Sequence, residues 1–435
     1  MTDTAMSGPA SFADAGRTRD PGAAPLTTAD GLPLKAALRR SQRRLRLQAV
    51  LLVLPLLLFI FVTFAIPIAM MMSRSVQNPE VSEFLPETAA VIDDWDGEGL
   101  PGEEVYAAMA RDLATGQENN TVGRVTARIN REIPGARGFM LGTAREAATL
   151  QPPYKEAMLA ANKGWGNERY WRLLKRETRS ITPAYYLLAL DYEYDSNGAI
   201  VKRPENYQVY QPLFLRTAWM SLVITGLTIL LGYPVAYLLA SLPLRTSNLL
   251  MILVLLPFWT SLLVRTSAWI VLLQQQGVIN DLLVFSGLLG DGSRLRMIYN
   301  QTGTIVAMTH VLLPFMILPL YSVMKTISPS YMRAARSLGA SNFRAFVTVY
   351  LPMTIPGIAA GTLLVFILAV GYYITPALVG GDSGIFISNL IAENMRGTGA
   401  QVRLAAALST LLLVGVLLFY WLFNKIVGVD RLKFG

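Results

Sequence analysis

The sequence predicts an all-α polytopic membrane protein with six transmembrane helices and an extracytoplasmic α(+β) insert between helices one and two. Apolar residues fill 53% of the 435 positions and charged residues only 15%, where a soluble domain holds about 25% charged residues. Six runs of about 20 residues or more carry few or no charges, which is long enough to cross a bilayer core of about 30 Å as helices. Helices are expected because they satisfy their backbone hydrogen bonds within one segment.

Charge is distributed unevenly along the chain. The formal net charge is +9, yet residues 77–211 hold 15 basic and 20 acidic residues. The rest of the chain holds 23 basic and 9 acidic residues. The basic excess therefore surrounds the apolar runs, which is typical of membrane topology and argues against nucleic-acid binding. The chain has no cysteine and one histidine, His310, so cysteine-ligated metals, thiol catalysis and a multi-histidine metal site within one chain are excluded. We expect no metal site.

The first apolar run follows a long polar segment. Residues 1–48 are predicted to be a disordered basic cytoplasmic tail, since they are rich in Ala, Gly, Pro and Thr and end in a basic cluster. That cluster comprises Arg39, Arg40, Arg43, Arg44 and Arg46. Residues 49–72 carry no charge, and this run exceeds the apolar core of about 7–15 residues of a cleaved signal peptide. We therefore place an uncleaved first transmembrane helix within 49–76.

Five further apolar runs follow residue 211. They are 217–242, 249–273, 302–324, 356–379 and 404–423, and they predict a five-helix core over 212–427 with a cytoplasmic tail at 428–435. Six spans place both termini on one side of the membrane. Most basic residues near the span ends fall on that side, which the positive-inside rule assigns to the cytoplasm. Arg74 and Arg216 lie on the opposite side and depart from the rule.

Residues 77–211 are long enough for a domain of their own. Their densest acidic stretch, 93–104, is interpreted as a solvated loop because it lacks the full spacing of a calcium-binding loop. Periodicity predicts amphipathic helices at 105–113 and 154–179. A β-hairpin is predicted over 187–202, with Ser196-Asn197-Gly198 as its turn. Two interpretations stay open: a spacer that packs on itself, or a docking domain.

The loop between the fourth and fifth spans, 326–352, carries strong capping signals. Ser330 is predicted to cap a first short helix that runs through Leu338. Gly339 is predicted to end that helix in a left-handed conformation. The helix has small side chains, so it either enters a groove of another protein or lies on the membrane surface.

A second short helix is predicted in the same loop. Ser341 is expected to cap it, and it runs to about Tyr350. Pro352 and Pro356 are then expected to stop this helix and to begin the fifth span.

These residues resemble a family signature. Membrane subunits of bacterial ABC importers carry a cytoplasmic loop with Glu-Ala-Ala, three residues, Gly, an apolar stretch and Leu-Pro. The matching residues are Ala334, Ala335, Gly339, Leu351 and Pro352. Arg333 stands at the position of the Glu. Over about residues 210–430 the chain is therefore similar to the binding-protein-dependent type I permeases, and segments 255–273 and 371–381 resemble the polyamine (spermidine/putrescine) branch.

The resemblance implies a fold and partners. The fold is the six-helix type I ABC importer permease architecture in the bacterial inner (plasma) membrane, with both termini cytoplasmic. The partners are two cytoplasmic ATP-binding subunits, a second permease subunit and an extracytoplasmic solute-binding protein, and the single insert favours a permease heterodimer. ATP and magnesium are expected in the partner ATPase, and this chain should bind no cofactor because it has no GxxxxGK[ST] loop. The chain is thus expected to be a transporter subunit and not an enzyme.

In such permeases the loop docks into the ATPase subunit and couples it to the spans. The residues that the resemblance assigns to coupling are Tyr331, Arg333, Ala334, Ala335, Leu338, Gly339, Ala340, Phe343, Leu351 and Pro352. Because Arg333 stands where the family has a Glu, the salt bridges that this Glu could form with the ATPase subunit are not expected here.

A candidate translocation path is drawn from polar and aromatic residues toward the outer ends of the spans. They are Trp259, Arg265, His310, Tyr372, Tyr373, Thr375 and Asp382. Arg265 is the only charge well inside a span, and it either faces the path or snorkels to backbone carbonyls or an outer-loop Asp. His310 is interpreted first as a hydrogen-bonded packing residue and second as a proton relay. The aromatic residues, with Trp269, either attract a cation or form the interfacial belt.

The function that these observations favour is polyamine import through an ABC permease. Other small organic cations, amino-acid derivatives or metal chelates are alternatives within the same family. A gradient-driven secondary transporter predicts internal repeats and acids inside the spans, and the sequence shows neither. A membrane receptor, with the insert as its ligand domain, predicts a cytoplasmic signalling domain.

Overall fold

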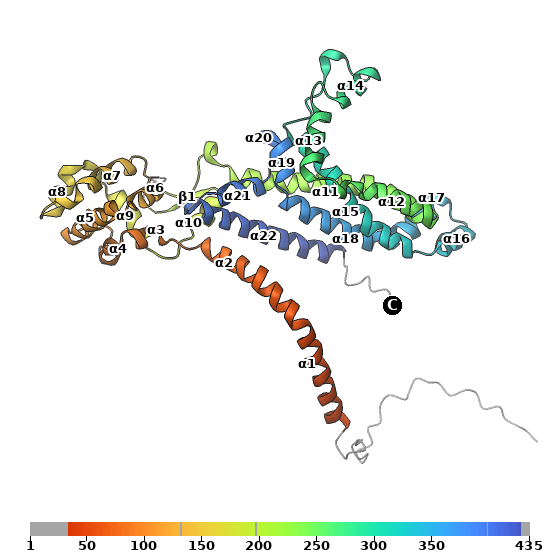
Figure 1. The fold of residues 1–435 in the computed structure, drawn as a ribbon, viewed down its shortest axis with the longest axis horizontal. Coiled ribbons are helices and arrows are strands. Elements are labelled where there is room, and N and C mark those ends of the chain that lie inside the picture. The colour runs from red at the N-terminus through yellow and green to blue at the C-terminus, as the bar shows by residue number, and fades with distance from the viewer. Residues whose placement is uncertain (1–33, 131–132, 196–197, 398, 428–435) are drawn as a thin grey trace, which may run out of the picture. The chain divides into compact units, whose positions relative to one another are not determined.

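The computed structural model describes residues 34–130, 133–195, 198–397 and 399–427 (Figure 1). Within these ranges the protein consists of helices and one two-stranded antiparallel sheet. Six of the described helical segments are long and apolar enough to cross a membrane, which confirms the all-α polytopic fold class. The chain divides into two compact units, Met1–Met70 and Met71–Gly435.

The first candidate span is a long helix with exposed apolar side chains. Helix α1 (Leu34–Ile60) passes through a π-helical turn (Phe61–Ala65) into α2 (Ile66–Arg74). None of its most apolar window is buried within the protein, as lipid-facing helices require. The predicted disorder of residues 1–48 is wrong from residue 34 onward, because the arginine-rich segment continues the helix and arginine is a good helix former. Residues 1–33 lie outside the described residues.

Helices α11 (Tyr210–Ser241), α15 (Gln301–Thr326) and α18 (Leu351–Gly371) form the core of the second unit. α15 is the most buried of the candidate spans, with 61% of its apolar window covered. Its buried face repeats every four residues: Met308, Leu312, Met316 and Leu320. Gly361 permits close approach of α18, since a Cβ there would lie 2.6 Å from the Met316 sulfur.

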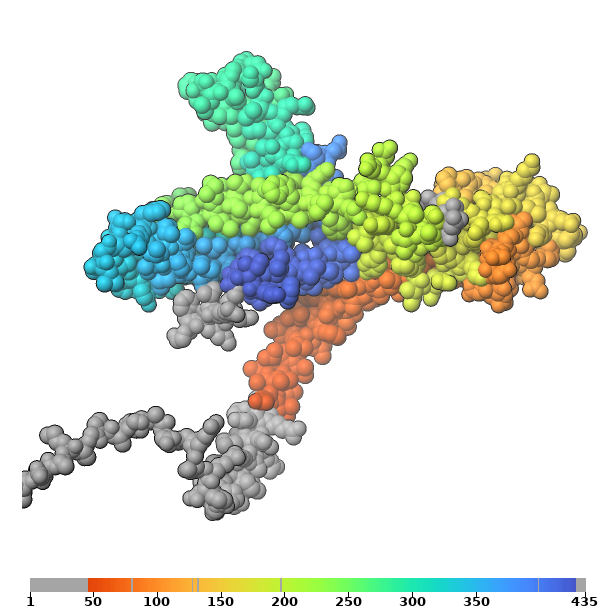
Figure 2. Space-filling view, turned by 180° about the vertical axis from the view of Figure 1, so that it is seen from behind, coloured from red at the N-terminus to blue at the C-terminus, as the bar shows by residue number. Residues whose placement is uncertain are grey.

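The third predicted span, 249–273, is wrong as a single helix. α12 (Leu244–Trp259) ends, and α13 (Leu262–Leu273) starts in a new direction and leads to α14 (Val278–Phe285) (Figure 1). Figure 2 shows the same projection from behind. The Pro257 carbonyl accepts hydrogen bonds from both the Thr260 backbone N–H and its hydroxyl, which closes the helix. The apolar segment long enough to cross a membrane is Leu262–Phe285.

The fifth predicted span also has different bounds. α17 (Asn342–Ala345), a π-helical turn (Phe346–Tyr350) and α18 run without interruption, so the prediction that Pro352 and Pro356 stop a helix is wrong. Pro352 directly follows the wide π-helical turn, and such turns are a common accommodation of irregular hydrogen bonding within a continuous helix. The helix ends at Gly371, and the rest of the predicted run forms the separate helix α19 (Ile374–Val379).

Three further helices complete the second unit beyond α19. They are α20 (Gly381–Gly384), α21 (Ile387–Met395) and α22 (Ala400–Val427). α22 confirms the sixth span. A 3₁₀ turn, Asp291–Ser293, lies in the connection between α14 and α15.

The insert is a small helical domain. Its helices are α3 (Pro79–Phe84), α4 (Pro86–Ile92), α5 (Glu103–Glu118), α6 (Val122–Ile129), α7 (Ala136–Glu146), α8 (Tyr154–Ala161), α9 (Glu168–Glu177) and α10 (Ala184–Ala189). Short 3₁₀ turns at Ala147–Thr149 and Lys163–Gly166 connect some of them, and a third, Glu205–Tyr207, precedes α11. The predicted helix at 105–113 is confirmed within α5.

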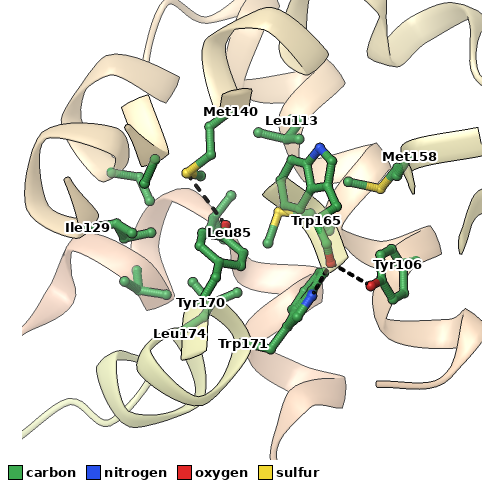
Figure 3. Close-up of a cluster of buried hydrophobic side chains, with 14 of the residues drawn as sticks. Leu85, Tyr106, Leu113, Ile129, Met140, Met158, Trp165, Tyr170, Trp171 and Leu174 are labelled. Atoms are coloured by element: carbon green, nitrogen blue, oxygen red, sulfur yellow. Dashed lines mark hydrogen bonds between the residues drawn. The ribbon is translucent and has the colours of Figure 1, made fainter. Parts of the chain in front are cut away.

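Aromatic side chains fill the centre of the insert (Figure 3). The Trp165 carbonyl accepts hydrogen bonds from the Tyr106 hydroxyl at 2.8 Å and from the Trp171 indole at 2.9 Å. The Trp165 indole donates to the Thr143 hydroxyl at 2.8 Å. Burial raises the pKa of Tyr106 to about 12. The polar groups of Tyr106, Trp165 and Trp171 thus have partners, as buried polar groups require.

Two sequence predictions in the insert need correction. The predicted helix 154–179 is interrupted, because the Asn162 and Asn167 side chains accept from the backbone N–H two residues later and close one helix and open the next. The hairpin is confirmed with shorter strands, β1 (Tyr192–Tyr194) and β2 (Ile200–Lys202), with Glu193 opposite Val201. Residues 187–189 belong to α10 instead of a strand. Ser196 and Asn197 of its predicted turn lie outside the described residues.

The insert is attached to the core by its two ends. Gln77 pairs with Ile181, and the Asn78 N–H donates to the Ser180 carbonyl at 2.9 Å, so the first and last parts of the helical domain meet. A hydrophobic cluster then joins α10 to α11, α21 and α22; its buried members include Tyr185, Leu213, Ile387, Leu404 and Leu408. This packing holds the base of the insert on the ends of the spans.

Candidate coupling loop and translocation path

The predicted coupling loop forms a short helix and a tight turn. α16 spans Pro329–Ser337, and its N-cap is Ser328, whose hydroxyl accepts from the Ser330 N–H, so the prediction of Ser330 as the cap is wrong by two residues. Gly339 has a φ of +91°, which confirms the left-handed end. The Ser341 hydroxyl accepts from the Arg344 N–H at 3.3 Å, which confirms the second cap.

α16 has two different faces. Residues 331, 334, 335 and 338 follow the spacing of one helical face, and the end of this face is open: Leu338 is 90% exposed and Tyr331 51%. Phe343, just after the turn, is 78% exposed. The opposite side carries Met332, Arg333 and Arg336, which line a cavity against the spans. Arg333 therefore lies apart from the exposed apolar face.

The remaining predicted coupling residues are placed differently. Ala334 is exposed, whereas Ala335 and Ala340 are half-buried. Leu351 and Pro352 form the first turn of α18, beyond the π-helical turn, so this part of the signature belongs to the span and not to the exposed helix. The structure thus concentrates exposed apolar surface on Tyr331, Leu338 and Phe343.

Several of the predicted path residues meet where α13, α15, α19 and the residue that ends α18 lie close together. The Trp269 indole donates to Nδ1 of His310 at 3.1 Å, and the two rings lie 5.4 Å apart. Thr266 and Thr375 are fully buried and their hydroxyls lie 3.4 Å apart. Arg265 is close enough to His310 and to Tyr372 to interact with both electrostatically. Residues from α13, α15, α19 and the end of α18 thus form one polar cluster.

Arg265 does not make the contacts expected of a snorkelling side chain. With the described residues its side chain forms no hydrogen bond and no salt bridge, and its Nε is buried without a partner. The nearby Trp269 is half-buried and bonded to His310, so it is not simply a belt residue. His310 thus has the hydrogen bond that its first interpretation expects.

Three predicted path residues lie away from this cluster or at the surface. Trp259 ends α12 and is 77% exposed. Tyr373 is 40% exposed, and its carbonyl accepts from the Asn389 amide. The Asp382 side chain is exposed, and its backbone carbonyl accepts from Arg216 at 2.9 Å. Over the described ranges, no group of three or more His, Asp or Glu could hold a metal ion, and this includes the acidic stretch 93–104.

Sequence reasoning missed Thr266. It is a buried hydroxyl in an apolar helix, next to Arg265 and one turn from Trp269. The available signal was its spacing, since residues three and four apart share a helical face. Its partner Thr375 is more than one hundred residues away, so only the fold could reveal the pair.

Comparison with known proteins places these features in a family. Residues 215–427 match the family described as "Binding-protein-dependent transport system inner membrane component". The spermidine/putrescine transport system permease protein PotB of Haemophilus influenzae is 35% identical over 231 residues, covering 52% of this chain and 80% of that protein. PotB of Escherichia coli is 34% identical over 233 residues, covering 51% of this chain and 82% of that protein.

A third relative extends the match slightly. The inner membrane ABC transporter permease protein YdcU of Escherichia coli is 32% identical over 265 residues, covering 59% of this chain and 80% of that protein. The family match begins in α11 and ends with α22, so it contains the predicted coupling loop and the polar cluster. The chain therefore belongs to the family of binding-protein-dependent transport system inner membrane components, the permease subunits of ABC importers.

Proposed function

We propose that this chain is a permease subunit of an ABC importer for polyamines such as spermidine or putrescine. The observation that carries the proposal is its 35% identity to a spermidine/putrescine permease over 80% of that protein's length. Other small organic cations, amino-acid derivatives and metal chelates are alternative substrates for the same path. In this proposal the chain performs no chemistry and binds no cofactor, and ATP with magnesium is bound by the partner ATPase.

The exposed apolar face of α16 is the surface proposed to enter the ATPase subunit. A helix that presents apolar side chains every three to four residues fits the groove of a partner. Tyr331, Leu338 and Phe343 supply the exposed area, and the caps at Ser328 and Ser341 hold the loop in shape. With this loop in the cytoplasm, both termini lie on the cytoplasmic side and the insert is extracytoplasmic.

The polar cluster around Arg265 is the proposed segment of the translocation path. Its hydroxyl, indole and phenol groups offer hydrogen bonds and π faces to an amine. Arg265 repels a cation, so in this proposal it stands at a point where the substrate passes without binding tightly. A second, non-identical permease subunit completes the path.

The first test is a tagged pull-down of the full chain from solubilised membranes, followed by uptake of labelled spermidine and putrescine. We expect recovery of an ATPase, a second six-span permease and a solute-binding protein, and uptake that needs ATP. Recovery of the chain alone, with uptake driven by an ion gradient, would support a secondary transporter instead.

The docking surface is tested by Leu338→Asp. Charge on this exposed face should reduce recovery of the ATPase at least tenfold, because burying an unpaired carboxylate costs several kcal/mol. Ser337→Asp, one residue away and off the apolar face, is the matched control and should recover the ATPase normally. Equal recovery with both variants would place the docking surface elsewhere.

A further inference from the structure

A cavity of about 570 Å³ lies between α16 and the nearby ends of the spans. The apolar and aromatic part of its lining consists of Tyr237, Met324, Ile327, Met332, Phe346 and Tyr350. The polar part consists of Ser241, Ser328, Arg333, Arg336 and Asn342, all of which are exposed. No Asp or Glu lines the cavity, and the whole loop 326–352 contains neither. The cavity is therefore amphiphilic, and its charge is positive.

The aromatic part is well supported. The Tyr237 ring meets the rings of Phe346 and Tyr350 edge to face, at centroid distances of 5.8 and 5.3 Å. Such contacts stabilise a preferred geometry of the rings. Tyr350 and Met324 are nearly fully buried, so they fix the base of the cavity.

The basic part is positioned by α16. Arg333 and Arg336 are three residues apart and lie on the same side of the helix, and the Arg336 Nε donates to the Met332 carbonyl. Neither guanidinium forms a salt bridge with any described residue. Arg333 thus replaces the family's carboxylate with a cation that faces the cavity, away from the exposed apolar face.

We propose that this cavity binds an anionic phospholipid, with the phosphodiester between Arg333 and Arg336 and the first acyl carbons along the aromatic wall. Guanidinium groups match the geometry of phosphate oxygens. Basic pockets at the ends of membrane spans are suited to anionic head groups. A free phosphate would use the arginines but leave the aromatic wall without a role. The bound lipid would join α16 to α11 and to the start of the fifth span, and so hold the loop in place.

The test is native mass spectrometry of the full-length chain, titrated with phosphatidylglycerol, phosphatidylcholine or inorganic phosphate. We expect the intact chain to prefer phosphatidylglycerol. The double variant Arg333→Gln/Arg336→Gln should bind it about tenfold or more weakly, because each basic group near a membrane surface adds roughly 1 kcal/mol. The matched control is Arg344→Gln, which removes an exposed arginine of the same loop that does not line the cavity. It should bind like the intact chain.

Arg333→Lys/Arg336→Lys serves as the second variant, since it keeps the charge and should restore most of the binding. Equal affinity for the two lipids, or equal loss with Arg344→Gln, would overturn the proposal. Inorganic phosphate that displaces the lipid at comparable concentration would overturn the lipid as the occupant. Displacement of the lipid when the ATPase assembles with the chain would instead assign the arginines to an acidic group of that partner.

Discussion

Asp191 links the insert to the second span through one side chain. It is fully buried, and its carboxylate accepts from the backbone N–H groups of Val209, Tyr210 and Gln211 at 3.0, 3.2 and 2.6 Å. These groups belong to the first turn of α11, where N–H donors have no partner within the helix. The negative charge also matches the positive end of the helix dipole. Asp191 therefore fixes where the insert ends and the span begins.

Replacing Asp191 with Ala should destabilise this junction. The loss of three accepted hydrogen bonds should cost about 1–3 kcal/mol, in the range of a lost helix cap with buried unpaired donors. We expect a lower apparent melting temperature of the full chain in detergent. Glu205→Ala removes a nearby exposed acid and is the control. An Asp191→Ala chain that melts together with the control would contradict the role of this cap.

Asp112 caps a helix in a similar way inside the insert, but there burial changes the pKa of the carboxyl group. Its carboxylate, on α5, accepts from the Thr88 N–H at 2.7 Å and the Glu87 N–H at 3.2 Å, at the start of α4. Burial raises the pKa of Asp112, and these hydrogen bonds offset the shift only in part. The folded chain therefore keeps this proton at pH values where the unfolded chain has lost it.

The sign of the pH dependence follows from linkage. An acid whose pKa is raised by folding stabilises the folded chain at low pH. This stability is lost as the pH rises from the pKa of the unfolded chain, about 3.9, through the pKa of the folded chain. Relative to Asp112→Asn, the native chain should therefore lose melting temperature as pH rises through that window. Glu118→Gln, an exposed acid on the same helix, should show no such difference. If the difference in melting temperature between the native chain and Asp112→Asn did not change with pH, or changed in the opposite direction, the pKa of Asp112 would not be raised by folding.

At the scale of elements, the shape of the proposed coupling loop depends on one glycine. Gly339 adopts a φ of +91°, and a Cβ there would meet no atom within 4 Å. Its requirement is therefore conformational and not steric. The direction in which the chain leaves α16 and enters α17 depends on this residue, because it lies in the turn between these two capped helices.

Gly339→Val should uncouple the loop while sparing the spans. A β-branched residue in the left-handed region costs roughly 1–3 kcal/mol, which is enough to reshape an exposed turn. We expect normal membrane expression with reduced transport and reduced stimulation of the partner ATPase. Asn tolerates this conformation, so Gly339→Asn should retain most of the activity. If the Val variant stimulated the ATPase fully, the geometry of this turn would have no part in coupling.

At the scale of the whole molecule, the features that the sequence predicts well are those that local physics decides. Charge-free runs must be helices in lipid, and Gly339 and Ser341 act within their own turn. Whether a proline ends a helix is not decided by such local physics. Pro257 precedes a break, whereas Pro352 and Pro356 lie in a continuous helix, because neighbouring turns and packing decide whether the freed carbonyl finds a donor.

The path cluster shows the same limit. Residues of the candidate path were chosen by type, but their meeting depends on how α13 leaves α12 and approaches α15. The bond from Trp269 to His310 joins residues 41 positions apart, and the Thr266–Thr375 pair joins residues 109 apart. Only tertiary packing makes such pairs, so the sequence identified the residue types without their partners.

The insert provides the largest test of function at this scale. Because Asn78 and Ser180 are already joined by a hydrogen bond, residues 79–179 can be replaced by a short Asn-Gly turn. This removes the aromatic core and keeps Asp191 with the cluster at the base of the insert. We expect the shortened chain to fold and to recover the ATPase, but to lose binding of the solute-binding protein, measured by pull-down from the extracytoplasmic side. A matched chain with the insert present and Met158→Leu, a volume-conserving change in the same core, should retain it. Undiminished docking of the solute-binding protein to the shortened chain would mean that the insert is a spacer packed on itself.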